Sequence, residues 1–136
     1  MSPATRLLVL DASIGVKWFK PESGREAALQ LLHEAAAGEI AIAVPTHFVH
    51  EVLSVVRRYF AHEDIIPAWE TLQDAGVSVV PLTDEVVREA ARQCGLLGCS
   101  FYDALAPACA ALLGATLVSA DAHAHGEYPD VQLIAQ

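Results

Sequence analysis

The chain has 136 residues, of which 54% are hydrophobic and 18% charged. This length and composition predict a single globular domain over residues 1–136 and exclude a disordered chain. The 17 acidic residues outnumber the 8 basic ones, giving a formal net charge of −9, which argues against simple electrostatic binding of nucleic acid. A cluster of acids that holds divalent cations would remain compatible with such a substrate, because the bound cations change the local charge.

The sequence gives no sign of a membrane or export segment. Its apolar runs are interrupted by Gly, Pro, His or Asp before they reach the roughly 18 residues of a membrane span, and the N-terminal stretch lacks a signal-peptide pattern. The cysteines are odd in number and have no Cys-x-x-Cys spacing, which predicts reduced thiols in a cytoplasmic protein. They are Cys94, Cys99 and Cys109.

The first half of the chain alternates short apolar runs with helical patterns. Residues 6–10 and 40–44 are continuous apolar runs, typical of buried parallel strands. Residues 14–19 predict a helical turn. Apolar residues at helical spacing predict helices over 23–37 and 46–61.

The second half continues this alternation and leads to a fold class. Its expected elements are a helix over 63–75, a strand over 77–82, a helix from Thr83 to a connector at 95–98, an apolar helix capped by Ser100 and ended by Gly114, a strand over 116–118 and an edge strand over 131–134. Short apolar strands separated by helices predict an α/β fold. We expect a three-layer α/β/α arrangement around a mostly parallel sheet of four to five strands.

The apolar helix after Ser100 contains an acid that needs an explanation. Asp103 is surrounded by apolar residues, and aspartate is rarely buried unless it is paired or bound to a metal. Ser100 and Asp103 also fit a capping box, in which each side chain bonds the other's backbone N–H. Pro107 cannot donate to the carbonyl of Asp103, so we expect the helix to be bent or loosened there.

Three further acids follow or begin elements that should meet at one edge of the sheet. Asp11 and Asp121 follow predicted strands, and Glu51 lies early in the helix after the second strand. Taken singly, each could be a cap or a solvated surface residue. Together with Asp103 they would repel one another unless cations join them, and carboxylate oxygens suit Mg²⁺ or Mn²⁺. One or two such ions could support phosphodiester hydrolysis.

The segments that carry these acids resemble the PIN domain over nearly the whole chain. They are LVLDAS, HFVHEV, SFYDA and LVSAD, in this order. Their spacing and the chain length are most similar to VapC-type toxins of prokaryotic toxin–antitoxin pairs. The resemblance implies a Mg²⁺- or Mn²⁺-dependent endoribonuclease that forms homodimers and binds a small inhibitory antitoxin.

The resemblance also implies roles for individual residues. Asp11, Glu51, Asp103 and Asp121 match the family's catalytic and metal-binding acids, and Ser13 and Ser119 match its supporting hydroxyl positions. The segment after Asp121 is poor in basic residues. The bases that we expect to contact RNA phosphates are therefore elsewhere, at Lys17, Lys20, Arg57 and Arg58.

Other functions remain open from the sequence. Histidines near Glu51 and after Asp121 could suggest a zinc hydrolase, although they do not form H-E-x-x-H. They are His47, His50, His123 and His125. Asp11 could be a phosphorylated aspartate, although the second acid of such enzymes is Ser13 here. The chain could also be a PIN-like binding module with little or no catalysis, or an RNA-processing nuclease that is not a toxin.

Overall fold

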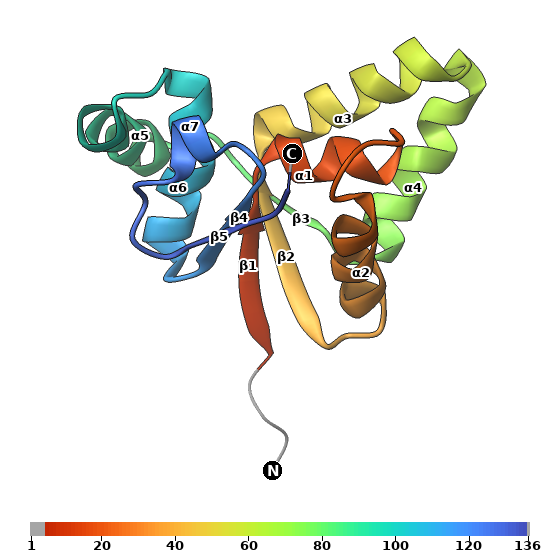
Figure 1. Cartoon of the computed structure of the whole chain (residues 1–136), viewed down its shortest axis with the longest axis horizontal. Coiled ribbons are helices and arrows are strands. Elements are labelled where there is room, and N and C mark those ends of the chain that lie inside the picture. Colours follow the sequence, from red (N-terminus) through yellow and green to blue (C-terminus); the bar gives the residue numbers. More distant parts are fainter. Residues whose placement is uncertain (1–4, 136) are drawn as a thin grey trace.

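The computed structural model describes residues 5–135 and has one parallel sheet of five strands. The strands lie in the order β3-β2-β1-β4-β5 (Figure 1). Their bounds are β1 Arg6–Leu10, β2 Ile40–Pro45, β3 Ser78–Val80, β4 Thr116–Ser119 and β5 Val131–Leu133. All four strand pairs are parallel.

Helices cover both faces of this sheet. Helices α1 to α4 lie on one side and α5 to α7 on the other (Figure 1). Their bounds are α1 Ala12–Gly15, α2 Arg25–Ala36, α3 Thr46–Tyr59, α4 Ile65–Asp74, α5 Asp84–Leu97, α6 Phe101–Leu113 and α7 Ala122–His125, with 3₁₀ turns at Val16–Trp18 and His62–Asp64. The expected three-layer α/β/α fold is confirmed.

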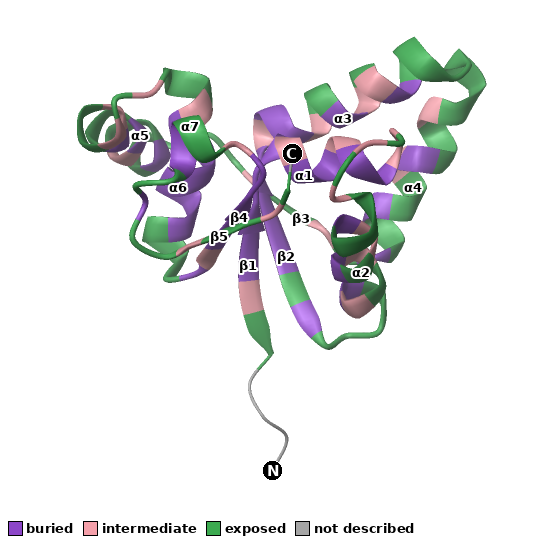
Figure 2. Cartoon of the chain, in the orientation of Figure 1, coloured by how far each residue is buried: buried purple, intermediate pink, exposed green. Residues whose placement is uncertain are grey.

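Two apolar cores explain why the central strands are apolar on both faces over most of their length. Leu8 and Leu10 of β1 pack with α1 to α4, whereas Val9 between them packs with α5 and α6. Successive side chains of a strand point to opposite faces, so a strand covered on both faces has no polar face. Burial is accordingly continuous over Leu8–Leu10 of β1, over Ile42–Pro45 of β2 and over Ala104–Ala110 in the middle of α6 (Figure 2).

The expected connector over residues 95–98 is wrong. Helix α5 continues through Gly95 to Leu97, and the chain turns at Gly98, whose φ is 66°. Gly95 keeps ordinary helical geometry, so glycine alone did not mark the end of this helix. The third strand is also shorter than expected, because β3 pairs only with Ala43 to Pro45 of β2.

Helix α6 runs through Pro107 without a break, so the expected loosening of the helix is not seen in its secondary structure. Within residues 5–135, no single helix has the length and apolar character of a membrane span. Helices α5 and α6 reach that length and apolar character only when they are taken together, and they are bent by 111° relative to each other.

Candidate active site

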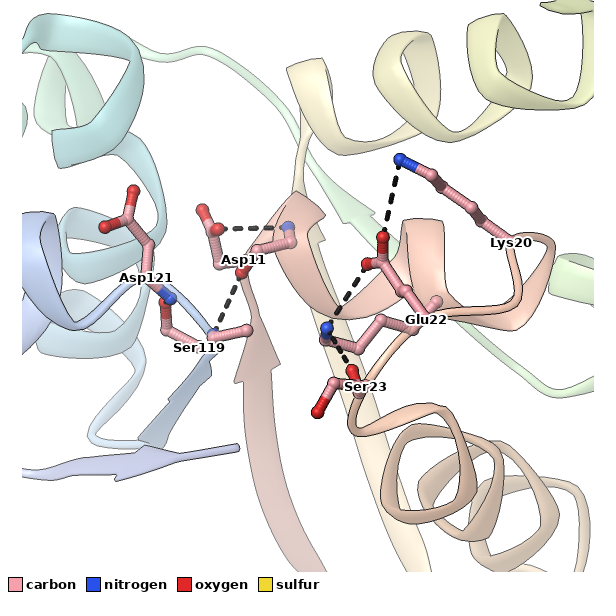
Figure 3. A network of polar contacts seen from close by, with 9 residues as sticks. Asp11, Lys20, Glu22, Ser23, Ser119 and Asp121 are labelled. Atoms are coloured by element: carbon pink, nitrogen blue, oxygen red, sulfur yellow. Dashed lines mark hydrogen bonds and ion pairs between the residues drawn. The ribbon is translucent and has the colours of Figure 1, made fainter. Parts of the chain in front are cut away.

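The parallel pairing of β1 and β4 brings Asp11 and Asp121 to the same edge of the sheet. Leu10 is in register with Val118, and the Asp11 N–H donates to the Val118 carbonyl over 3.0 Å. Figure 3 shows both carboxylates projecting from the strand ends toward the same space. The carboxyl ends of strands in open α/β sheets are where ligands bind.

Asp11 is held by the turn that follows β1. Its side chain is only 7% exposed, and its Oδ2 accepts a hydrogen bond of 3.0 Å from the Ser13 N–H. The Ser13 Oγ in turn accepts a 3.0 Å bond from the Ala120 N–H. Ser13 therefore ties the end of β1 to the end of β4, as a supporting residue would.

Asp121 caps the short helix α7 and is tied to Ser119. Its Oδ1 accepts a 3.0 Å bond from the Ala124 N–H, while its own N–H donates to the Ser119 Oγ over 3.0 Å. Ser119 is fully buried. Among the described residues, the second carboxylate oxygen of Asp121 and that of Asp11 accept no hydrogen bond, so each acid caps with one oxygen and keeps the other free.

The capping role expected of Ser100 is half present. Its Oγ accepts a 3.1 Å bond from the Asp103 N–H. Within residues 5–135 the Ser100 N–H donates no hydrogen bond to the Asp103 carboxylate, so the capping box is incomplete. The Asp103 carboxylate, which is half-buried, is not used to cap the helix.

Glu51 on α3 lies within electrostatic reach of the other acids. Partial burial, together with the charges of Asp11 and Asp103, raises the pKa of its carboxyl above the ordinary value. The same two acids act on His47, although burial still lowers the pKa of that histidine. Asp103 and Asp121 both act on the thiol of Cys99, whose pKa is raised mainly by burial. Asp11, Glu51 and Asp103 are thus electrostatic neighbours, and Asp121 is linked to Asp103 through their common effect on Cys99.

The raised pKa of Glu51 makes the stability of the metal-free protein pH-dependent at this residue. The folded state binds this proton more tightly than the unfolded state, so stability falls as the pH rises through the raised pKa. Glu51→Gln is expected to raise the Tm by roughly 1–2 °C at about pH 7 in EDTA, a small gain because Glu51 is exposed. The gain should vanish near about pH 4, where Glu51 is protonated.

Thermal denaturation monitored by circular dichroism measures this difference. Glu70→Gln on the exposed face of α4 is the matched control, with no pH-dependent gain expected. An equal shift at both pH values, or a shift shared by the two variants, would contradict the electrostatic coupling of Glu51.

Two hollows open on either side of the acids. The larger, of about 680 Å³, lies between the first turns of α3 and α6, and Glu51 is on its wall. Exposed aromatic rings line it: Phe101 is 41% and Tyr102 66% exposed. The smaller, of about 310 Å³, is lined by Ser13, Lys17 and Asp121, among others.

The basic residues expected to contact phosphate lie in different settings. Lys17 is only 2% exposed, and its Nζ donates to Glu22 Oε1 over 3.2 Å and to the Ser23 carbonyl over 2.6 Å. Lys20 also pairs with Glu22, at 3.4 Å. Lys17 is therefore engaged inside the protein and is dropped from the expected phosphate contacts. Arg57 and Arg58 are exposed in the last turn of α3.

The histidines do not assemble a zinc site. His125 is completely buried and hydrogen-bonded, whereas His123 is exposed on α7. Within residues 5–135, no three side chains of His, Cys, Asp or Glu gather closely enough to hold a metal ion as they stand. The donor chemistry around the strand ends is instead that of carboxylates, which suit hard divalent cations.

Three residues make contacts near the acids that the sequence did not predict. Tyr102 and His47 meet edge to face, with ring centroids 5.9 Å apart, and the buried Nδ1 of His47 has no hydrogen-bond partner among the described residues. His125 bonds the Asp103 carbonyl. The missing N–H of Pro107 is the one sequence signal that could have revealed this contact, since an orphaned carbonyl needs a donor.

Solved structures with the same fold include proteins of toxin–antitoxin pairs. A toxin–antitoxin complex from Klebsiella pneumoniae has a TM-score of 0.72 and 16% identity, covering 92% of this chain and 95% of that one. VapBC2 from Rickettsia felis, bound to a DNA fragment from its promoter, has a TM-score of 0.69 and 16% identity. The match covers 96% of this chain and 97% of that one. Mycobacterium tuberculosis VapC20, a toxin that cleaves the sarcin–ricin loop, has a TM-score of 0.64 and 16% identity. The match covers 89% of this chain and 92% of that one.

Sequence comparison with curated proteins gave no match. The model of one family, described as PIN domain, matches residues 8–126, a span that includes all four acids. With most of its length matched and the expected fold formed, the chain belongs to the PIN domain family.

Proposed function

We propose that the protein is an endoribonuclease that hydrolyses RNA phosphodiester bonds with Mg²⁺ or Mn²⁺ and acts as the toxin of a toxin–antitoxin pair. The observation that supports this most directly is the placement of acids near the carboxyl edge of the parallel sheet. Asp11 and Asp103 both raise the pKa of Glu51, and Asp121 follows the strand beside Asp11. Neighbouring carboxylates repel one another, and bound cations would remove that repulsion.

The residues present fit a hard divalent cation. The free oxygens of Asp11 and Asp121, with the carboxylate of Asp103, would be its main ligands. Glu51 would be a further ligand or a base beside it. A cation bound there supplies charge neutralisation for the RNA phosphate and acidifies water.

The chain's own residues then have distinct roles. Glu51 is the carboxylate whose raised pKa suits it to accept a proton from water. Ser13 and Ser119 hold the backbone at the two strand ends, through bonds to the N–H groups of Ala120 and Asp121. They orient the acids without taking part in proton transfer.

The hollow between α3 and α6 supports single-stranded or loop RNA as the substrate class. Nucleobases stack on aromatic rings with little dependence on sequence. Phe101 and Tyr102 expose such rings next to Glu51. A base seated there would leave the adjoining phosphate near the carboxylates.

The toxin assignment carries proposals about partners and location. The relatives of known structure include toxin–antitoxin complexes, two of them bound to DNA. By analogy, this chain would be inhibited by a small antitoxin that covers the site, would form a homodimer and would act in the cytoplasm. Exposed apolar side chains on α5 and α6, such as Leu96 and Leu112, offer surface for protein contacts.

Cleavage of a labelled single-stranded RNA by the purified protein tests the proposal. Cleavage is expected with Mg²⁺ or Mn²⁺, none with EDTA, and a return when the metal is restored. A protein that binds an antitoxin but never cleaves RNA would be a binding module, and that result would contradict the proposal. Cleavage that persists in EDTA would contradict the metal dependence.

Thermal stability with Mn²⁺ tests the metal site without a substrate. At about 100 times its Kd, Mn²⁺ is expected to stabilise the folded protein by about 2.7 kcal/mol, and so to raise the Tm by several degrees. Asp103→Asn should show a much smaller rise, and should be the more stable of the two without metal because one repelling charge is gone. Scanning calorimetry measures both.

Asp74→Asn, which removes an exposed acid at the end of α4, is the control and should respond to Mn²⁺ as the wild type does. If Mn²⁺ changes the Tm of neither the wild type nor Asp103→Asn, Asp103 is only a helix residue and the metal site is wrong.

A further inference from the structure

Pro107 deprives one site residue of a helical hydrogen bond. Proline has no N–H, so the carbonyl four residues earlier in α6, that of Asp103, lacks its usual donor. In this protein His125 takes the place of that donor: its Nε2 lies 2.6 Å from the Asp103 carbonyl oxygen. The imidazole is completely buried between α7 and α6, which lie side by side in Figure 1.

The other ring nitrogen of His125 reaches the second strand end. Its Nδ1 lies 2.6 Å from the Oγ of Ser119, which is also fully buried. The same Oγ accepts the N–H of Asp121, and Figure 3 shows Ser119 directly beneath that acid. Two buried side chains therefore connect the backbone of Asp103 to the backbone of Asp121.

The donors and acceptors determine which atom donates in each of these hydrogen bonds. A carbonyl oxygen can only accept, so the hydrogen of His125 is on Nε2. A neutral imidazole then accepts at Nδ1, and Ser119 must donate its hydroxyl hydrogen to it. Ser119 is left with a lone pair for the Asp121 N–H, so both ring nitrogens of His125 and the hydroxyl of Ser119 have partners.

We infer that His125, acting through Ser119, is a positioning residue that sets Asp103 and Asp121 relative to each other for cation binding. The inference rests on the proposed function, because it assigns the two acids to one cation site. A histidine that only packed α7 against α6 would affect stability but not the affinity for the cation. Hydrogen bonds to the residues that hold ligands change metal affinity by about 10–100-fold in proteins of many folds.

The protonation of the ring in the metal-free wild type is the first test. Long-range ¹H–¹⁵N spectra of the histidine rings should show His125 with its hydrogen on Nε2 and an unprotonated Nδ1. A hydrogen on Nδ1 with none on Nε2 would overturn the inference, because the Asp103 carbonyl would then have no donor. This readout needs no variant and no metal.

A double-mutant cycle with Pro107 is the second test. His125→Phe keeps a ring but makes neither bond, and is expected to raise the Kd for Mn²⁺, measured by titration calorimetry, at least about tenfold. In the Pro107→Ala background, residue 107 regains an N–H for the Asp103 carbonyl. In that background the same His125→Phe change should raise the Kd clearly less. The Kd of His125→Gln should lie between those of the wild type and His125→Phe, because the glutamine amide can donate to that carbonyl.

His123→Phe, on the exposed side of α7, is the matched control and should leave the Kd unchanged. Wild-type Mn²⁺ affinity in folded His125→Phe, or an equal loss in both Pro107 backgrounds, would overturn the inference alone. Failure of the wild type to bind Mn²⁺ would overturn the proposed function, and the role of His125 in cation binding with it.

Discussion

Replacement of Asp11 by asparagine is expected to reduce metal-dependent RNA cleavage about 1,000-fold, because a lost cation ligand removes several kcal/mol of transition-state stabilisation. The fold should survive this change. Asp11 caps α1 by accepting the Ser13 N–H, and asparagine caps as well as aspartate does. Single-turnover cleavage with saturating enzyme measures the rate, and the Tm verifies the fold.

Asp74→Asn carries the same chemical change at an exposed position on α4 and should cleave at the wild-type rate. Normal cleavage by Asp11→Asn would show that the reaction does not use this edge of the sheet. The four-acid site would then be wrong, whatever the response to Mn²⁺.

Gly15→Ala is expected to destabilise the protein by about 2–3 kcal/mol, because an added methyl group would overpack the core. A Cβ at Gly15 would lie 2.4 Å from the Phe48 ring and 2.6 Å from a Val52 methyl, and both of those side chains are completely buried. Helix α1 would have to move away from α3. The Tm should fall by roughly 10 °C, as measured by thermal denaturation.

Gly95→Ala is the matched control, since a Cβ there meets nothing within 4 Å and the residue is already helical. It should stabilise the protein by about 0.5–1 kcal/mol through helix propensity. If Gly15→Ala were as stable as the wild type, α1 would not be packed against α3 as described. Because Asp11 begins α1, that outcome would also change the setting of the site.

The core strands were predictable because of how they are covered. Residues 7–10 and 40–44 are all apolar because helices cover both faces of β1 and β2, and the structure confirms both strands. The end of α5 was not predictable from glycine alone. Gly95 and Gly98 are both suited to a turn, but the helix continues past Gly95 to Leu97, which packs against the core.

The acids could be proposed as a site because strand ends in a parallel sheet share an edge. The hydrogen-bond partners of side chains could not be predicted, because they depend on the paths of loops, which local sequence patterns do not determine. Lys17 is an example: its ammonium is buried by Glu22 and Ser23, residues that the sequence does not mark as its partners. Pro107 was recognised as an anomaly, but only the fold brings His125 to the carbonyl it orphans.

The bond from the Ala120 N–H to the Ser13 Oγ joins residues 107 positions apart. During synthesis, β1 emerges before β4 and has no β4 beside it until all the helices and strands between them have been made. Closing so long a loop is slow and comes late in folding. A nascent or prematurely terminated chain that lacks residues 116–121 would therefore carry Asp11, Glu51 and Asp103 without the strand that completes the site.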